Sequence, residues 1–295
     1  MAEVKRKYYK TGELKSECFE LNGKREGEYK SYHQNGQLYE IYNCIDGKKN
    51  GECKEYFKNG QLCEICLYID GKKNGEYKAY YDNSKHKNQS SIDSFGCDLT
   101  NVNSKHKNQS SIDSFGQLEI LCSYIDGKRN GEFKSYHQNG QKLIMCSYID
   151  DNKNGEYKQY YDNGQLWRVC SYVDDKMNGE HKQYWNNGWE LTNVNSNHVN
   201  LSTDSHGQLQ MLCFEIDYKI NGEYKEYYED GQLKILCSYI DSNKNGEYKE
   251  YHKNGQLYVN CCYIDDKKNG EYKEYNELGV LIKTSMYDNG VEIIT

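Results

Sequence analysis

The sequence predicts an all-β protein, an elongated, twisted, single-layer antiparallel sheet of about ten tandem β-hairpins. Three observations predict this fold class. The motif Gly-Glu-x-Lys-x-Tyr occurs nine times, and most successive copies begin 24 residues apart. The chain has 31 Tyr, which favour strands, and no Pro, which would remove a ladder hydrogen bond. Apolar and polar residues alternate between recurring Asn-Gly or Asp-Gly pairs, as expected of strands joined by tight turns.

Each repeat reads as one hairpin when it is numbered from the Gly of this motif, so that Gly27 is position 1 and Gly36 is position 10. Positions 2–8 alternate and are rich in Tyr, which predicts a first strand. Positions 9 and 10 are usually Asn-Gly, which predicts a two-residue type I′ turn. Positions 11–19 form the second predicted strand, and positions 20–24 turn the chain into the next repeat.

A two-residue turn fixes which positions face each other across the hairpin. Position 3 then faces 16, position 7 faces 12, and the Gly at position 1 faces 18, where a Tyr could lie across the backbone. These positions share one sheet face, and the other face carries Glu at 2, Lys at 4, Tyr at 6 and aliphatic residues at 15 and 19. The alternative fold is a β-solenoid with one coil per repeat, which would stack equivalent positions about 4.8 Å apart.

Two polar segments interrupt the array at places where an Asn-Gly turn is expected. The predicted organisation is an N-terminal part of the array over 1–83, a polar insert with an internal duplication over 84–115, a middle part over 116–187, a second polar insert over 188–206, and a C-terminal part with a degenerate cap over 207–295. The inserts are either binding loops carried by a rigid array or duplications that the fold tolerates.

The repeated residues also carry a family resemblance. The run Asn-Gly-Glu-Tyr-Lys-x-Tyr-Tyr-x-Asn-Gly-Gln-Leu, followed by Tyr-Ile-Asp-Gly-Lys, resembles the MORN repeat in its variant bacterial and large-DNA-virus form. The resemblance covers nearly the whole chain apart from the two inserts. It implies arrays of antiparallel hairpins that serve as scaffolds, self-association surfaces or lipid-proximal modules, and some relatives carry a toxin–antitoxin label.

The cysteines and histidines are interpreted as packing residues. Eight of the thirteen Cys occupy position 16, and equivalent positions in successive hairpins are expected about 9.6 Å apart, too far for a disulfide or a shared zinc ion. His33, His137 and His252 at position 7 and His181 at position 3 stand where other repeats carry aromatic residues. The sequence therefore predicts no catalytic residue, no metal site and no cofactor.

The Glu-Lys-Tyr triplet at positions 2, 4 and 6 is the candidate interaction stripe, because Tyr is enriched at protein interfaces. Its representative residues are Glu28, Lys30, Tyr32, Glu156, Lys158, Tyr160, Glu247, Lys249 and Tyr251. The alternative is purely structural, with cross-strand ion pairs and Tyr packing worth about 0.2–1 kcal/mol per pair. The sequence leaves both interpretations open.

Charge and targeting signals exclude several functional classes. The 38 Lys+Arg and 45 Asp+Glu are interspersed, so there is no basic patch for nucleic acid. The first residues lack the apolar core of a signal peptide, no apolar run could span a membrane, and thirteen Cys suit the reducing cytoplasm. We therefore expect a cytoplasmic, non-enzymatic scaffold whose partner is an unidentified protein or the chain itself. The alternatives are a peripheral membrane module, which the acidic balance disfavours, and an antitoxin-like protein that neutralises a partner protein.

Overall fold

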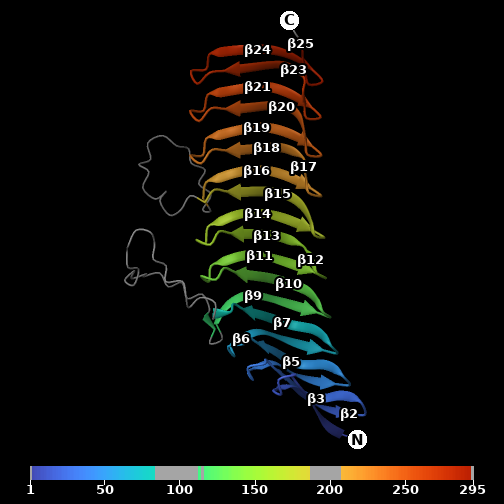
Figure 1. Cartoon of the computed structure of the whole chain (residues 1–295). Helices are drawn as coiled ribbons and strands as arrows, with labels where there is room; N and C mark the ends of the chain where they lie inside the picture. Colours follow the sequence, from blue (N-terminus) through green and yellow to red (C-terminus); the bar gives the residue numbers. More distant parts are fainter. Residues whose placement is uncertain (1, 84–111, 114–115, 187–206, 294–295) are drawn as a thin grey trace, which may run out of the picture. The chain divides into compact units, whose positions relative to one another are not determined.

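The computed structural model describes residues 2–83, 112–113, 116–186 and 207–293. The elements of these residues are β-strands joined by turns, which confirms the all-β antiparallel fold class. Among them, no helix has the length and hydrophobicity needed to cross a membrane. The chain divides into two compact units, Met1–Asp151 and Asn152–Thr295. Within each unit the strands follow one another in chain order (Figure 1).

The first unit is a single antiparallel sheet in which each strand pairs with the next. Its strands are β1 (Ala2–Tyr8), β2 (Leu14–Leu21), β3 (Lys24–Tyr32), β4 (Leu38–Ile45), β5 (Lys48–Tyr56), β6 (Leu62–Ile69), β7 (Lys72–Tyr80), β8 (Ile112–Asp113), β9 (Gly116–Ile125), β10 (Lys128–Tyr136) and β11 (Lys142–Ile149). The strand β7 pairs with β9 across the first insert, and β8 adds two residue pairs to β9.

The second unit repeats this arrangement. Its strands are β12 (Asn152–Lys153), β13 (Gly155–Tyr160), β14 (Leu166–Val173), β15 (Lys176–Tyr184), β16 (Leu209–Ile216), β17 (Lys219–Ile220), β18 (Gly222–Tyr227), β19 (Leu233–Ile240), β20 (Asn243–Tyr251), β21 (Leu257–Ile264), β22 (Lys267–Lys268), β23 (Gly270–Tyr275), β24 (Leu281–Asp288) and β25 (Val291–Ile293). The strand β15 pairs antiparallel with β16 across the second insert. Because sequence neighbours pair antiparallel in both units, the solenoid alternative is wrong.

The Asn-Gly pairs lie at hairpin ends as predicted, but their predicted turn type is wrong. The N–H of Gly36 donates to His33 O over 2.9 Å and that of His33 to Gln37 O over 2.8 Å. Gly36, and not Asn35, has a positive φ of 83°, so the loop is a three-residue type I turn followed by a left-handed Gly. Asn35 instead accepts the Gln37 N–H through Oδ1 at 3.2 Å. The same Gly bond closes the turns at Asn59-Gly60, Asn139-Gly140, Asn163-Gly164, Asp230-Gly231 and Asn254-Gly255.

The type I′ turn occurs at the other end of each repeat. Asp46 and Gly47 have φ angles of 53° and 82°, and Ile45 directly faces Lys48. Two successive left-handed residues between directly paired strands define this turn type. The second turn residue is not Gly in every repeat, and Asp151, Asp175, Tyr218, Ser242 and Asp266 adopt the same left-handed region.

The predicted register holds in the body of the hairpin and fails near the Asn-Gly end. Gly27 faces Cys44 and Tyr29 faces Tyr42, as predicted, but Tyr32 faces Leu38 and one residue of β4 is extra at this point. This β-bulge lengthens β4 by one residue, which offsets the extra residue in the three-residue loop. The Leu at position 12 therefore faces Tyr at position 6, and the predicted pairing of positions 7 and 12 is wrong.

Position 1 requires Gly for its backbone conformation and not because a side chain would lack room. Gly51 has a φ of 88°, and nothing lies within 4 Å of a Cβ built on it. The pairing of β4 with β5 shifts register beside Gly51, between Ile41 and Asn43. The left-handed Gly makes this bulge possible, so the prediction that it makes room for the facing Tyr68 is wrong.

Each sheet has two faces, which we name by their residues. The Tyr-Cys face carries positions 3, 16 and 18, and the Glu-Lys-Tyr face carries positions 2, 4, 6, 12, 15 and 19. Most buried side chains of the Tyr-Cys face are Tyr and Cys, such as Tyr42, Cys44 and Cys53 in the first unit and Cys237, Tyr248 and Cys261 in the second. The interpretation of the position-16 cysteines as small core residues is confirmed for all of them except the half-buried Cys18.

The predicted inserts and the degenerate cap have different outcomes. Segment 188–206 lies outside the described residues, and so does 84–115 apart from Ile112–Asp113. The last hairpin lacks an Asn-Gly pair, yet Gly279 N–H donates to Asn276 O over 2.9 Å. The degenerate repeat therefore keeps the same turn.

Candidate interaction surface

Glu and Lys of the candidate stripe form ion pairs along each strand. Lys30 Nζ lies 2.5 Å from a carboxylate oxygen of Glu28 on β3, and this hydrogen bond raises the pKa of Lys30. The same pair recurs as Lys54–Glu52, Lys78–Glu76, Lys134–Glu132, Lys158–Glu156, Lys182–Glu180, Lys225–Glu223, Lys249–Glu247 and Lys273–Glu271. The pairs run within a strand, so the cross-strand pairing of the structural alternative is wrong. Because the carboxylates are mostly exposed, solvent screens these pairs and each contributes little to stability.

The Tyr residues of the stripe are partly structural. Tyr32, Tyr160 and Tyr251 are half-buried, and each faces a Leu at position 12 of its own hairpin. Burial raises the pKa of Tyr160. In other repeats the burial goes further, and Tyr80 is 2% exposed beside Leu62 and Leu118. The structure thus brings Glu, Lys and Tyr onto one face within each repeat, but the Tyr rings supply packing as well as surface.

Aliphatic side chains at position 19 form the most exposed apolar feature of this face. They are exposed by 46–57%, and we call them the aliphatic row. Its members are Ile45, Ile69, Ile125 and Ile149 in the first unit and Val173, Ile216, Ile240 and Ile264 in the second. The candidate stripe named from the sequence omitted these residues, although an aliphatic residue stands at position 19 of every complete repeat before the last.

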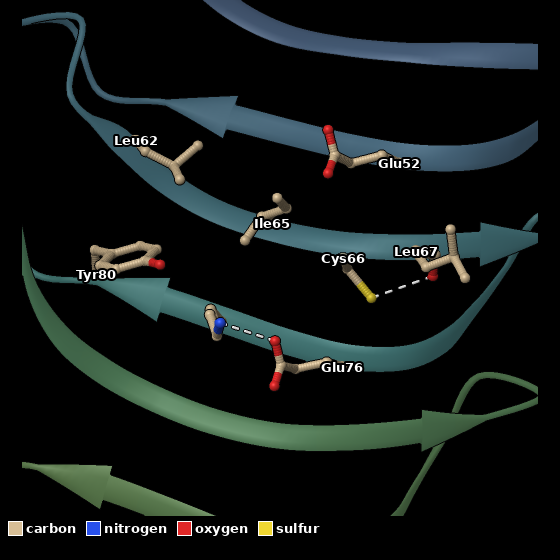
Figure 2. Close-up of a pocket in the computed structure, with 8 residues that line it drawn as sticks. Glu52, Leu62, Ile65, Cys66, Leu67, Glu76 and Tyr80 are labelled. Carbon is tan, nitrogen blue, oxygen red and sulfur yellow. Dashed lines mark hydrogen bonds and ion pairs between the residues drawn. The ribbon is translucent and has the colours of Figure 1, made fainter. Parts of the chain in front are cut away.

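An open hollow lies among residues of the Glu-Lys-Tyr face in the first unit (Figure 2). It spans β5, β6 and β7 and has a volume of about 480 Å³. Leu62, Ile65 and Tyr80 line its apolar part, and the exposed Leu67 stands at its margin. The ion-paired Lys78–Glu76 borders it. The hollow therefore presents apolar side chains beside a neutralised charge pair.

The repeats identify the family. The MORN repeat variant family matches residues 25–43, 49–70, 129–150, 153–174, 220–241, 244–265 and 268–289, which together are 151 of the 295 residues. The chain belongs to the MORN repeat variant family.

Other comparisons add little to this assignment. No curated protein matches the chain. The TcdB2-TccC3 crystal structure matches with a TM-score of 0.21 and 11% identity over 98% of this chain and 15% of that chain. The Photorhabdus luminescens Tc holotoxin pore matches with a TM-score of 0.20 and 11% identity, over 92% of this chain and 14% of that chain. A porin-like protein from Bacteroides uniformis matches with a TM-score of 0.16 and 10% identity, over 87% of this chain and 92% of that chain. This MORN chain thus spans about 15% of the length of the toxin chain it matches.

On the Tyr-Cys face of the MORN repeats, neighbouring side chains pack against one another. The rings of Tyr157 and Tyr172 meet edge to face with centroids 5.5 Å apart, and Lys153 Nζ lies 5.1 Å from the Tyr172 centroid. Equivalent cations at position 23 are Arg25, Lys49, Lys73, Arg129, Lys244 and Lys268. Their role was not predicted, because position 23 was assigned to a turn. A basic residue recurring two residues before most of the Gly-Glu motifs was the available signal.

The cysteines and position-7 histidines of the repeats have structural roles. Every described Cys is a free thiol. Burial raises the pKa of Cys170 and of Cys261 to about 11, which keeps these thiols protonated and poorly reactive. His33 Nε2 lies 2.8 Å from Tyr56 O in the next repeat, where Tyr161 uses its hydroxyl on Tyr184 O. The position-7 His is therefore a hydrogen-bonding residue and not only an aromatic substitute.

Two groups of side chains bring possible metal ligands within 4.8 Å of one another, Glu40–Cys53–Glu55 and His181–Cys213–Glu215. In the first group Lys49 donates to Glu40, and its Nζ lies 3.7 Å from Cys53 Sγ. A cation thus already occupies that group. His181 was predicted to be a packing residue, and the second group was not predicted, because cysteines were compared between repeats and not with side chains of the same hairpin.

Proposed function

We propose that this MORN array is a non-enzymatic scaffold that binds another protein, or a second copy of itself, through its Glu-Lys-Tyr face. The aliphatic row carries the proposal. Exposed apolar side chains that gather on one face mark an interaction surface more often than side chains scattered singly. Because the row repeats once per hairpin, it offers a partner regularly spaced anchors within each unit.

The charges beside the row favour a protein partner over a membrane. Each Lys at position 4 is paired with the Glu at position 2 of its own strand. The net charge of the chain is −7. Attraction to anionic lipid needs unpaired basic residues beside an apolar surface, whereas a neutral, partly apolar face suits a protein surface.

The cysteines support a cytoplasmic setting for the scaffold. Every Cys in the described ranges is free, and most are buried. Disulfides are rare in reducing compartments and common in secreted repeat domains. The proposal therefore places partner and array together in the cytoplasm.

The test replaces two neighbouring members of the aliphatic row in the first unit. Ile45→Ser combined with Ile69→Ser removes two anchors that are 56% and 51% exposed. We expect binding to a captured partner, or self-association, to weaken at least tenfold, because apolar anchors carry most interface energy. The circular dichroism spectrum is expected to stay unchanged. Leu278→Ser is the matched control, since Leu278 is 85% exposed but lies in a turn outside the row.

Three measurements on the purified chain decide between the classes. Affinity capture from the native host identifies protein partners, light scattering measures self-association, and co-sedimentation with anionic liposomes measures lipid binding. Loss of capture or self-association in the double Ser variant, with retention in the control, supports the scaffold. Tight liposome binding by a monodisperse monomer that captures no protein would instead favour the peripheral membrane module.

A further inference from the structure

One repeat of the second unit departs from the others on the Tyr-Cys face. Position 3 is His181 where most repeats have Tyr, and position 18 is Glu215 where most also have Tyr. Cys213, at position 16, faces His181 directly across β15 and β16, and Glu215 follows two residues later on the same face. The three side chains therefore meet within a single hairpin.

The three side chains are buried and close together. His181 is 8% exposed, Cys213 is 2% exposed and Glu215 is 9% exposed. His181 Nδ1 lies 2.7 Å from Glu215 Oε1, and Cys213 Sγ lies 3.8 Å from the same oxygen. The second ring nitrogen of His181, Nε2, is buried and has no hydrogen-bond partner in the described part of the chain. The hydrogen bond to Glu215 thus leaves part of the binding capacity of this imidazole unused.

The cations that serve other repeats are missing around this group. Position 23 carries Lys or Arg over the Tyr rings elsewhere, but the two flanking residues here are Met177 and Ile220. Met177 is 7% exposed, and Ile220 directly faces Glu215. In the Glu40–Cys53–Glu55 group of the first unit, the ammonium of Lys49 supplies the positive charge. Here His181 is the only basic side chain paired with Glu215 in the described residues.

We propose that His181, Cys213 and Glu215 bind a divalent transition-metal ion of the zinc type. An imidazole nitrogen, a thiolate sulfur and a carboxylate oxygen are the donors that zinc prefers. Around a tetrahedral ion with bonds of about 2.0–2.3 Å, neighbouring donors lie about 3.3–3.6 Å apart. The separations of His181 Nδ1 and Cys213 Sγ from Glu215 Oε1, 2.7 and 3.8 Å, bracket this spacing, and the three donor atoms all lie within 4.8 Å of one another. Nδ1 would exchange its hydrogen bond for the metal, and Nε2 would carry the ring proton. Three protein ligands leave a fourth position for water or a further ligand.

The direct test uses the full chain, stripped of metal by a chelator and kept reduced. We expect one equivalent of Co²⁺ to bind with a thiolate-to-cobalt charge-transfer band, and Zn²⁺ to displace it. Because an ion that binds the folded state stabilises it, free zinc at about 100 times its Kd should raise the Tm of the second unit by about 5–10 °C. Absence of the charge-transfer band in the wild-type chain would overturn the proposal and leave a buried His–Glu pair.

Variants assign the ligands without relying on a damaged fold. His181→Tyr with Glu215→Tyr restores the residues of the other repeats, so we expect it to fold and to lose cobalt binding at least a hundredfold. Cys213→Ser should abolish the charge-transfer band. Cys237→Ser is the matched control, because Cys237 is equally buried at position 16 of the next repeat, and it should retain the band. An unchanged band in the double Tyr variant or in Cys213→Ser would place the metal elsewhere.

Discussion

At the scale of single residues, the ammonium group of Lys49 contacts two Tyr rings and a carboxylate on the Tyr-Cys face of the first unit. Lys49 Nζ lies 4.5 Å from the ring centroid of Tyr42 and 5.1 Å from that of Tyr68, and it donates to Glu40. Burial opposes the charge of Lys49, but the hydrogen bond to Glu40 and nearby acidic groups outweigh burial and raise its pKa. The Glu40 side chain is only 14% exposed. An ion pair in such surroundings is costly to break from one side.

Removing Lys49 alone is therefore expected to destabilise the fold. Lys49→Met leaves the Glu40 carboxylate without its cation and should lower the free energy of unfolding by about 2–4 kcal/mol. Lys48→Met is the control, because the Lys48–Asp70 pair is mostly exposed, and its loss should cost far less than the loss of Lys49. Adding Glu40→Leu to Lys49→Met should recover much of the loss of stability. Met177 occupies the position of Lys49 in another repeat and is buried there, so an apolar residue fits this position. Urea unfolding measures all three, and equal losses for Lys48 and Lys49 would contradict the prediction.

At the scale of elements, the hairpin ends are tied to one another by side chains at position 7. His33 and His252 use Nε2, and Tyr9, Tyr81, Tyr161 and Tyr228 use a hydroxyl, to reach the carbonyl of position 6 in the next repeat. Neutral His and Tyr can each donate one hydrogen bond from the far end of a flat ring. This shared geometry explains why His and Tyr can each occupy position 7.

The role of position 7 is testable with two substitutions at one site. His33→Tyr keeps a donor and should leave the free energy of unfolding within about 0.5 kcal/mol of the wild type. His33→Phe removes the donor and leaves the Tyr56 carbonyl with one bond fewer, which should cost about 0.5–1.5 kcal/mol. Thermal or urea unfolding gives the difference. If both variants lose the same stability, ring packing alone accounts for position 7.

Sequence periodicity predicted the strands well and their junctions poorly. Alternation and the Asn-Gly signal placed both strands of each hairpin, because those patterns depend on residues next to each other. The type I′ turn was assigned to the wrong end of the repeat, since Asn35 acts through its side-chain oxygen and not through a left-handed backbone, whereas Asp46 does adopt that backbone. The bulge beside Tyr32 leaves no trace in the alternation. The His181 group was missed because cysteines were compared between repeats, and the side chains that face each other within one hairpin were not.

At the scale of the whole molecule, stability is expected to be spread over repeats that contact only their neighbours. Within each unit the long strands pair antiparallel in chain order, and β7 pairs with β9 past the two-residue β8. The free energy of such an array is approximately a sum of repeat terms and neighbour interfaces. No single central core has to remain intact, so whole repeats should be removable where the strand sequence on both sides of a junction is equivalent.

Deleting residues 51–74 tests this additivity, because it joins Asn50 to Gly75 and recreates the native order Lys-Lys-Asn-Gly-Glu. The strand β7 should then pair with β4 in the register that β5 has now, so the sheet closes without a gap. We expect a native circular dichroism spectrum and a denaturant m-value for the first unit lower by roughly one sixth, in proportion to the surface removed. Deleting 51–62, half a repeat, is the control. It removes one strand and puts β6, a second-strand sequence, in the place where β5 pairs with β4. The facing positions then no longer match, and the cooperative transition of the unit should be abolished. Loss of structure in the 51–74 deletion as complete as in the control would show that the unit folds around one indivisible core.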